Sequence, residues 1–137
     1  MTEQTCATPS SMRPRIALYS HDTMGLGHIR RNTLIAQTLI QPPLSAQVLL
    51  VSGIRESGAF ALPPGIDSIT LPAYHKQPDG NYTARALDMP LEQLVALRSQ
   101  TILAALTAFA PQLLIVDNVP RGALSELDTV LPTMRAR

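Results

Sequence analysis

Apolar residues in this chain follow two patterns, short unbroken runs and longer stretches with helical spacing. The unbroken runs do not alternate with polar residues, which is typical of strands buried on both faces of a parallel sheet. They predict strands at Arg15–Ser20, Gln47–Ser52 and Gln112–Asp117. The segment Ile66–Leu71 does alternate, so it predicts a strand nearer the edge of the sheet.

Helical spacing occupies most of the segments between these runs, and prolines interrupt it. The predicted helices are Ile29 up to Pro42-Pro43, a short helix at Ile54–Leu62, a long helix at Pro90–Phe109 with Asp88 as its cap, and Leu124–Ala136 with breaks near Asp128 and Pro132. Strands that alternate with helices favour the α/β class. We therefore expect a Rossmann-like open parallel sheet with helices on both faces.

A long polar segment, Pro72–Met89, separates the third strand from the long helix. Gln77-Pro78-Asp79-Gly80 at its centre is a strong turn sequence. The residues on either side, 74–76 and 81–83, could pair as a small hairpin. A loop of this length in a compact domain is usually functional or disordered.

Length and composition limit the classes of protein. The 137 residues correspond to one domain, and a hydrophobic content of 45% is enough for a core. The net charge of +1, with scattered arginines, argues against a nucleic-acid surface. No apolar run is long enough to span a membrane and no secretory signal is visible. The single Cys6 cannot form an internal disulfide, so a reducing, cytoplasmic location is expected.

The two ends of the chain differ from its middle. Residues 1–14 are polar and are expected to be a disordered tail, which leaves residues 15–137 as the folded domain. The sequence stops at Arg135-Ala136-Arg137 within a helical pattern that has no capping glycine, so we expect a truncated domain.

The stretch Ser20–Asn32 joins the first strand to the first helix through a glycine-rich turn. Gly25, Leu26 and Gly27 form the turn, and its backbone can approach a ligand closely. The free N–H groups at the start of the helix would point at that ligand. Arg30 and Arg31 lie in the first turn, where the helix dipole disfavours cations, so an anion could offset them.

Three common sites fit this turn poorly. A dinucleotide fingerprint needs a third glycine where Arg30 stands, and an acidic residue where Ser52-Gly53 ends the second strand. The Gly-Lys-Ser/Thr of a phosphate loop is absent. His21, His28 and His75 lack metal-ligand spacing, so no metal site is expected.

His28 and Asp117 are candidates for one site, although they lie far apart in the sequence. Ligands bind at the carboxyl ends of parallel strands, and both residues follow such ends. A carboxylate bonded to an imidazole raises its basicity, which suits a general base. The structural alternatives are a histidine bonded to a backbone carbonyl and an aspartate that caps the next segment. His21 and Asp22 are expected to form the turn, with His21 as a fallback base.

The glycine turn, Gly25-Leu26-Gly27-His28, followed by Ile29-Arg30-Arg31-Asn32, resembles the start of a GT-B glycosyltransferase. The likeness is to bacterial predicted glycosyltransferases related to family 28, which includes the peripheral-membrane GlcNAc transferase of peptidoglycan synthesis. Further stretches that resemble that group are Leu49–Gly53, Gly58–Phe60, Leu62–Gly65, Leu114–Asp117 and Pro120–Gly122.

The resemblance implies the acceptor-binding half of an enzyme that transfers a hexosyl group to a hydroxyl acceptor. The donor would be a nucleotide sugar, expected to be a UDP-sugar, with no tightly bound cofactor and no metal. A C-terminal donor-binding domain, in the same chain or a separate subunit, would complete the site, so the chain alone would be inactive. The acceptor would be a small molecule or lipid-linked, with membrane association at most peripheral, at the inner face.

The resemblance also assigns roles to particular residues. His28 would be the base and Asp117 its orienting partner. Phosphate or acceptor oxygens would meet a set of residues around the two loops: Gly25, Leu26, Gly27, Arg30, Arg31 and Asn118. Acceptor choice would depend on the long loop, through Tyr74, Lys76, Tyr82 and Arg85.

Two other functions stay open at this point. The domain could be a non-catalytic α/β module that binds a phosphorylated ligand or a partner chain. It could also be a nucleotide-dependent oxidoreductase, which the residues at positions 30 and 52 disfavour.

Overall fold

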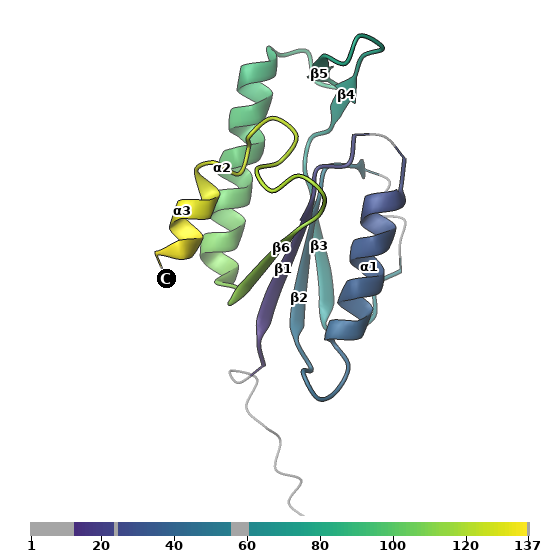
Figure 1. Cartoon of the computed structure of the whole chain (residues 1–137), viewed down its shortest axis with the longest axis vertical. Helices are drawn as coiled ribbons and strands as arrows, with labels where there is room; N and C mark the ends of the chain where they lie inside the picture. Colours follow the sequence, from purple (N-terminus) through teal and green to yellow (C-terminus); the bar gives the residue numbers. More distant parts are fainter. Residues whose placement is uncertain (1–12, 24, 56–60, 137) are drawn as a thin grey trace, which may run out of the picture.

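A computed structural model describes residues 13–23, 25–55 and 61–136. Its main sheet has four parallel strands in the order β3-β2-β1-β6. The strands are β1 (Arg15–Ser20), β2 (Gln47–Ser52), β3 (Ile66–Thr70) and β6 (Leu113–Val116). All four run in one direction, so their carboxyl ends lie at the same edge of the sheet (Figure 1).

Helices cover both faces of this sheet. Helix α1 (Gly27–Leu39) lies on one face, and α2 (Leu91–Phe109) with α3 (Val130–Arg135) lies on the other (Figure 1). The expected α/β parallel sheet with helices on both faces is therefore confirmed, and this arrangement is compatible with a Rossmann-like fold. The described part contains only these four strands in the parallel sheet.

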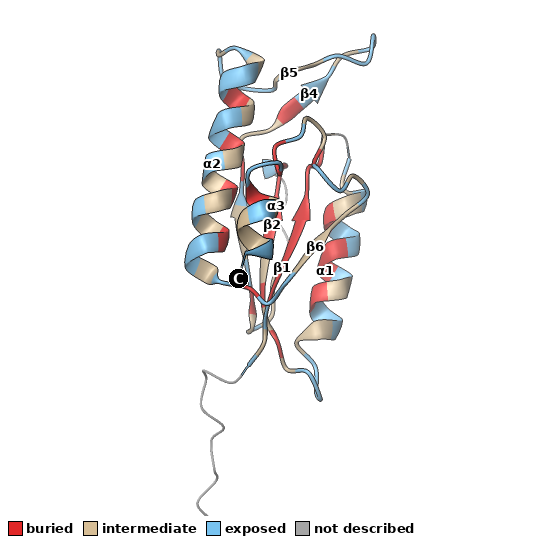
Figure 2. Ribbon diagram, turned by 60° about the vertical axis from the view of Figure 1, so that its left-hand side comes forward, coloured by how far each residue is buried: buried red, intermediate tan, exposed pale blue. Residues whose placement is uncertain are grey.

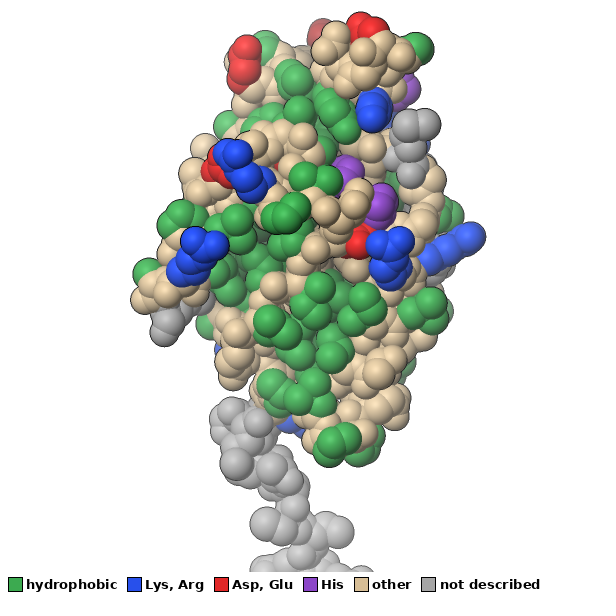
Figure 3. Space-filling model, viewed as in Figure 1, with side chains coloured by type: hydrophobic (Ala, Val, Ile, Leu, Met, Phe, Trp, Pro, Cys, Tyr) green, Lys and Arg blue, Asp and Glu red, His purple; other side chains and the backbone are tan. Residues whose placement is uncertain are grey.

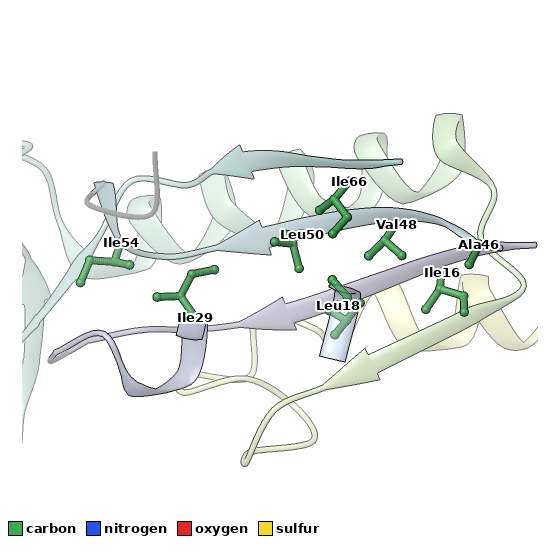
Figure 4. Packing of buried hydrophobic residues seen from close by; sticks show 9 residues of the cluster. Ile16, Leu18, Ile29, Ala46, Val48, Leu50, Ile54 and Ile66 are labelled. Carbon is green, nitrogen blue, oxygen red and sulfur yellow. The ribbon is translucent and has the colours of Figure 1, made fainter. Parts of the chain in front are cut away.

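The unbroken apolar runs are explained by a core on each side of the sheet. Alternate residues of β1 face opposite ways: Ile16 and Leu18 pack under α1, whereas Ala17 and Tyr19 pack under α2 and α3. Figure 4 shows the first of these clusters, and Figure 2 shows that the central strands are buried along most of their length. A strand between two cores needs apolar side chains at every position.

The predicted hairpin is confirmed. Strands β4 (Tyr74–Lys76) and β5 (Tyr82–Ala84) pair antiparallel across the turn at Gln77–Gly80. The hairpin projects beyond the carboxyl edge of the main sheet (Figure 1). It therefore stands beside the edge where the candidate site is expected.

Two details of the strand and helix predictions are wrong. β6 is an edge strand and is only partly buried, with Leu113 49% exposed, rather than fully buried. Helix α2 has Pro90 as its N-cap residue and no side-chain cap, so Asp88 does not cap it. An edge strand has one side without a neighbour, which explains its exposure.

The C-terminal segment also departs from its prediction. Residues 124–129 form turns, and only Val130–Arg135 is helical. Pro132 does not break this helix because it is the third helical residue, whose N–H would have no partner within the helix. The predicted tail at 1–14 and the predicted helix at Ile54–Leu62 fall mostly on residues 1–12 and 56–60, outside the described residues.

Candidate functional site

The turn after β1 leads directly into the first turn of α1. Gly25 has a φ of +68°, a backbone conformation that glycine adopts without strain. Helix α1 then begins at Gly27 with no side-chain cap, so no cap hydrogen bond from the described residues occupies its first N–H groups. A Cβ atom at either glycine would meet no atom within 4 Å, so the space in front of the turn is open. An anion could approach the helix terminus there.

His28 and Asp117 meet at this edge. His28 Nδ1 lies 2.5 Å from Asp117 Oδ2, and Arg31 donates a hydrogen bond of 2.7 Å to Asp117 Oδ1. The Asp117 side chain is nearly buried, whereas that of His28 is 28% exposed. The carboxylate therefore has a partner on each oxygen and holds the Nδ1 edge of the imidazole.

This geometry fixes which nitrogen of His28 is available. When the neutral ring donates from Nδ1 to the carboxylate, Nε2 is left as a proton acceptor. The partly exposed ring lies next to the open glycine turn. Figure 3 shows histidine side chains beside acidic and basic ones at this place on the surface. The arrangement is suited to removing a proton from a bound hydroxyl group.

His21 and Asp22 lie behind this pair. Both are buried, and Asp22 has a φ of +43°, as expected for a residue within a tight turn. The Asp22 carboxylate accepts hydrogen bonds from the Ser20 and Ser52 hydroxyls, the second at 2.9 Å. Burial, reinforced by the charge of His28, lowers the pKa of the His21 imidazole. Its ring centroid lies 5.5 Å from that of His28.

The other residues predicted around the glycine turn do not form one cluster. Leu26 packs against the core under α1, so its side chain is not free for a ligand. Arg30 is exposed and borders a shallow hollow of about 260 Å³ along α1. Asn118 is exposed in the loop after β6, with a φ of +69°. Arg31 is held by Asp117, whereas Arg30 forms no ion pair with any residue that the structure describes.

The predicted acceptor loop needs one correction. Tyr74 is fully buried, with its ring under the Arg98 guanidinium at 4.1 Å, so it cannot touch an acceptor at the surface. Lys76 lies 5.9 Å from the centroid of the Tyr82 ring, on the outside of the hairpin. The backbone N–H of Arg85 donates to Ala73 at 3.0 Å and anchors the end of the hairpin.

A hollow of about 270 Å³ opens beside the same loop. It is lined by the last residue of β3 and by residues that follow β2, β3 and β5, largely apolar with one guanidinium: Arg55, Thr70, Leu71, Pro72, Ala73, Ala86 and Leu87. The hollow lies at the carboxyl edge of the sheet, as the His28–Asp117 pair does. The part of the loop that could contact a ligand is therefore the part that lines this hollow, and not the buried Tyr74 side chain.

A buried polar cluster of Tyr19, Arg98 and Glu126 lies beneath the site and was not predicted. All three side chains are almost completely buried, and the Tyr19 hydroxyl bonds both the guanidinium and the carboxylate. One signal in the sequence could have indicated it. Arg98 stands in register with Leu94 and Ile102, at the four-residue spacing of the buried face of α2.

Comparison with known proteins adds no assignment, since no family model, curated protein or solved structure matches this chain. Within the described ranges, no helix has the length and apolar character needed to cross a bilayer. The same residues contain no group of three or more histidine, cysteine or acidic side chains placed to hold a metal ion. Fold and geometry together define a Rossmann-like α/β domain with a His–Asp pair at the carboxyl edge of its sheet.

Proposed function

We propose that this chain is the acceptor-side domain of a nucleotide-sugar-dependent glycosyltransferase of the GT-B type, with His28 as the general base. The observation that carries the proposal is the 2.5 Å contact between His28 Nδ1 and Asp117 Oδ2, beside an open glycine turn. The resemblance of the segment 25–32 to the start of such enzymes motivates the choice of reaction. A donor-binding domain, in the same protein or a separate subunit, would form the other wall of the cleft.

The proposed chemistry uses the free nitrogen of His28. Nε2 takes the proton of an acceptor hydroxyl as that oxygen bonds to the anomeric carbon of the donor sugar. The bond between the sugar and the nucleotide phosphate breaks, and its electron pair leaves with the nucleoside diphosphate. Asp117 stabilises the imidazolium that forms, because its carboxylate lies against the protonated Nδ1.

Charge and shape around the pair fit this reaction. In the proposed complex, the first N–H groups of α1 would face the negative charge that develops on the departing phosphate, and the exposed Arg30 in the same helical turn would add positive charge. The largely apolar hollow bordered by Arg55 and Leu87 would receive the acceptor. Its one guanidinium fits an acceptor with an apolar body and a single anionic group.

The test is the release of UDP from a panel of UDP-sugars, with hydroxyl compounds as acceptors. The enzyme is the native assembly purified through a tag on this chain, so that any donor-binding partner is retained. We expect acceptor-dependent release, which His28→Ala lowers by about 10²- to 10⁴-fold without weakening UDP binding. His75→Ala is the matched control, because His75 is exposed on β4. Unchanged release by His28→Ala would contradict the role of the base.

A second function, a non-catalytic module that binds a phosphorylated ligand, is favoured by the open helix terminus and exposed Arg30. Titration of the isolated chain with inorganic pyrophosphate separates the two. Saturable binding that Arg30→Gln weakens, together with no UDP release by the tagged assembly, would support this function and exclude the first.

A further inference from the structure

The two loops that carry His28 and Asp117 are also joined from inside the protein. The Asp117 backbone N–H donates to the Tyr19 carbonyl at 2.9 Å, and the Tyr19 hydroxyl donates to Glu126 Oε1 at 2.5 Å. Residue 117 begins the loop after β6, and residue 126 lies near its end. Tyr19 therefore holds both ends of this loop against the end of β1.

Glu126 shapes that loop. Its carboxylate accepts hydrogen bonds from the backbone N–H groups of Ala123, at 3.3 Å, and Leu124, at 2.8 Å. Without that carboxylate, these two part-buried N–H groups would need other partners. The inward-turned carboxylate thus keeps residues 122–126 in a closed turn, and the chain before it leads back to Asp117.

Arg98 makes the corresponding contacts to the loop after β1. Its Nη2 atom donates to the Tyr19 hydroxyl at 2.9 Å and to the His21 carbonyl at 3.3 Å. Its Nη1 atom donates to the Pro72 carbonyl at 2.6 Å, which attaches the start of the hairpin. One guanidinium on α2 therefore fixes the backbone between β1 and the glycine turn that leads to His28.

We propose that the buried cluster of Tyr19, Arg98 and Glu126 positions the His28–Asp117 pair. Among the described residues, no side-chain hydrogen bond or ion pair joins the cluster to His28 or Asp117. The cluster sets the distance between the two loops from inside the protein, and the contact between the imidazole and the carboxylate joins them at the surface. These three residues are positioning residues, and their meaning for catalysis rests on the proposed function.

The experiment reads the imidazole of His28 directly in the full 137-residue chain. Nitrogen-15 chemical shifts of the ring report the ratio of the Nδ1–H to the Nε2–H tautomer of the neutral imidazole. In the wild type the carboxylate of Asp117 favours the Nδ1–H form. Tyr19→Phe removes one hydroxyl and both of its hydrogen bonds, so we expect this ratio to fall by about two-fold or more.

Three further variants separate positioning from a general loss of stability. Tyr82→Phe deletes the same atom from a partly exposed hairpin tyrosine and should leave the ratio unchanged. Ile16→Val weakens the core on the other face of the sheet, and it too should leave the ratio unchanged. Glu126→Gln removes the charge but keeps the shape, and it should lower the ratio even if Tyr19→Phe does not fold.

The proposal is overturned if the tautomer ratio is the same in wild type, Tyr19→Phe and Glu126→Gln, or if Ile16→Val lowers it as much. This result does not depend on the reaction, because no substrate is present. In the transfer assay, Tyr19→Phe should lower kcat several-fold and leave the KM of the acceptor unchanged. A lower tautomer ratio in Tyr19→Phe and Glu126→Gln, combined with no transfer activity in the wild-type assembly, would support the positioning role and reject the glycosyltransferase.

Discussion

Replacement of the buried Arg98 should be among the most damaging single changes in the chain. The Arg98→Met variant keeps a long side chain of similar reach and removes the charge. It deletes three donated hydrogen bonds, to Pro72, Tyr19 and His21, together with the stacking on Tyr74 at 4.1 Å. It also removes the cation 3.8 Å from the Glu126 carboxylate.

The size of the effect is a balance of opposing terms. Hydrogen bonds from a charged donor contribute about 1.5 to 3 kcal/mol each, whereas burying the guanidinium costs several kcal/mol. Removal of one partner from a buried ion pair costs about 3 to 5 kcal/mol. The Glu126 carboxylate would keep its hydrogen bonds from the Tyr19 hydroxyl and from two backbone N–H groups, so the lower end of that range of about 3 to 5 kcal/mol applies. We expect a loss of about 3 kcal/mol, a large part of a typical stability of about 5 to 15 kcal/mol.

Urea unfolding followed by far-UV circular dichroism measures this loss, since the chain has no tryptophan. Arg55→Met is the matched control, because Arg55 is exposed, and it should change the stability by no more than about 0.5 kcal/mol. The double variant Arg98→Met/Glu126→Gln should lose at least about 1 kcal/mol less than the sum of the two single variants. A loss below about 1 kcal/mol for Arg98→Met would refute the reasoning.

Other predictions concern the same edge of the sheet. Gly53→Ala should lower Tm by about 3 to 10 °C, because the added Cβ would lie 1.9 Å from the His21 carbonyl oxygen; a melting curve like that of the wild type would contradict that contact. Burial and the charge of His28 keep the pKa of His21 below its usual range, so the unfolded chain binds more protons. The stability from neutral His21 is complete above about pH 6.5 and is lost as the pH falls below it, and urea midpoints should show a weaker acid loss in His21→Asn. Arg31→Gln should change the stability by less than about 1 kcal/mol, because its salt bridge to Asp117 is exposed on the arginine side; a larger change in urea midpoint would argue against this.

The parallel sheet and the meeting of the two loops could be predicted from the sequence. Apolar side chains at successive positions of β1 require a core on each side, and the structure has Ile16 and Leu18 on one face and Ala17 and Tyr19 on the other. Loops meet at the carboxyl ends of adjacent parallel strands, and this rule predicts that His28 and Asp117 lie close together. β1 and β6 are neighbours in the sheet, and the two side chains are in contact.

The burial of Arg98 could have been inferred from its register with Leu94 and Ile102, but its partners in the buried polar cluster could not, because they come from distant segments. Arg98 lies 79 residues from Tyr19, and Glu126 lies 107 residues from it, so no local pattern pairs them. The same cluster explains one wrong prediction, because Tyr74 is buried with its ring packed against Arg98. Residues 124–129 are not helical because Ser125 has a φ of +61°, which interrupts a right-handed helix.

The non-additivity of substitutions in the His28–Asp117 pair tests the central claim most directly. UDP release by the tagged native assembly is compared for His28→Gln, Asp117→Asn and the double variant. If Asp117 acts only through the imidazole, the double variant should have the same kcat as His28→Gln alone, since residues that act as a unit are not additive. Losses in the double variant that equal the product of the two single losses would contradict the account.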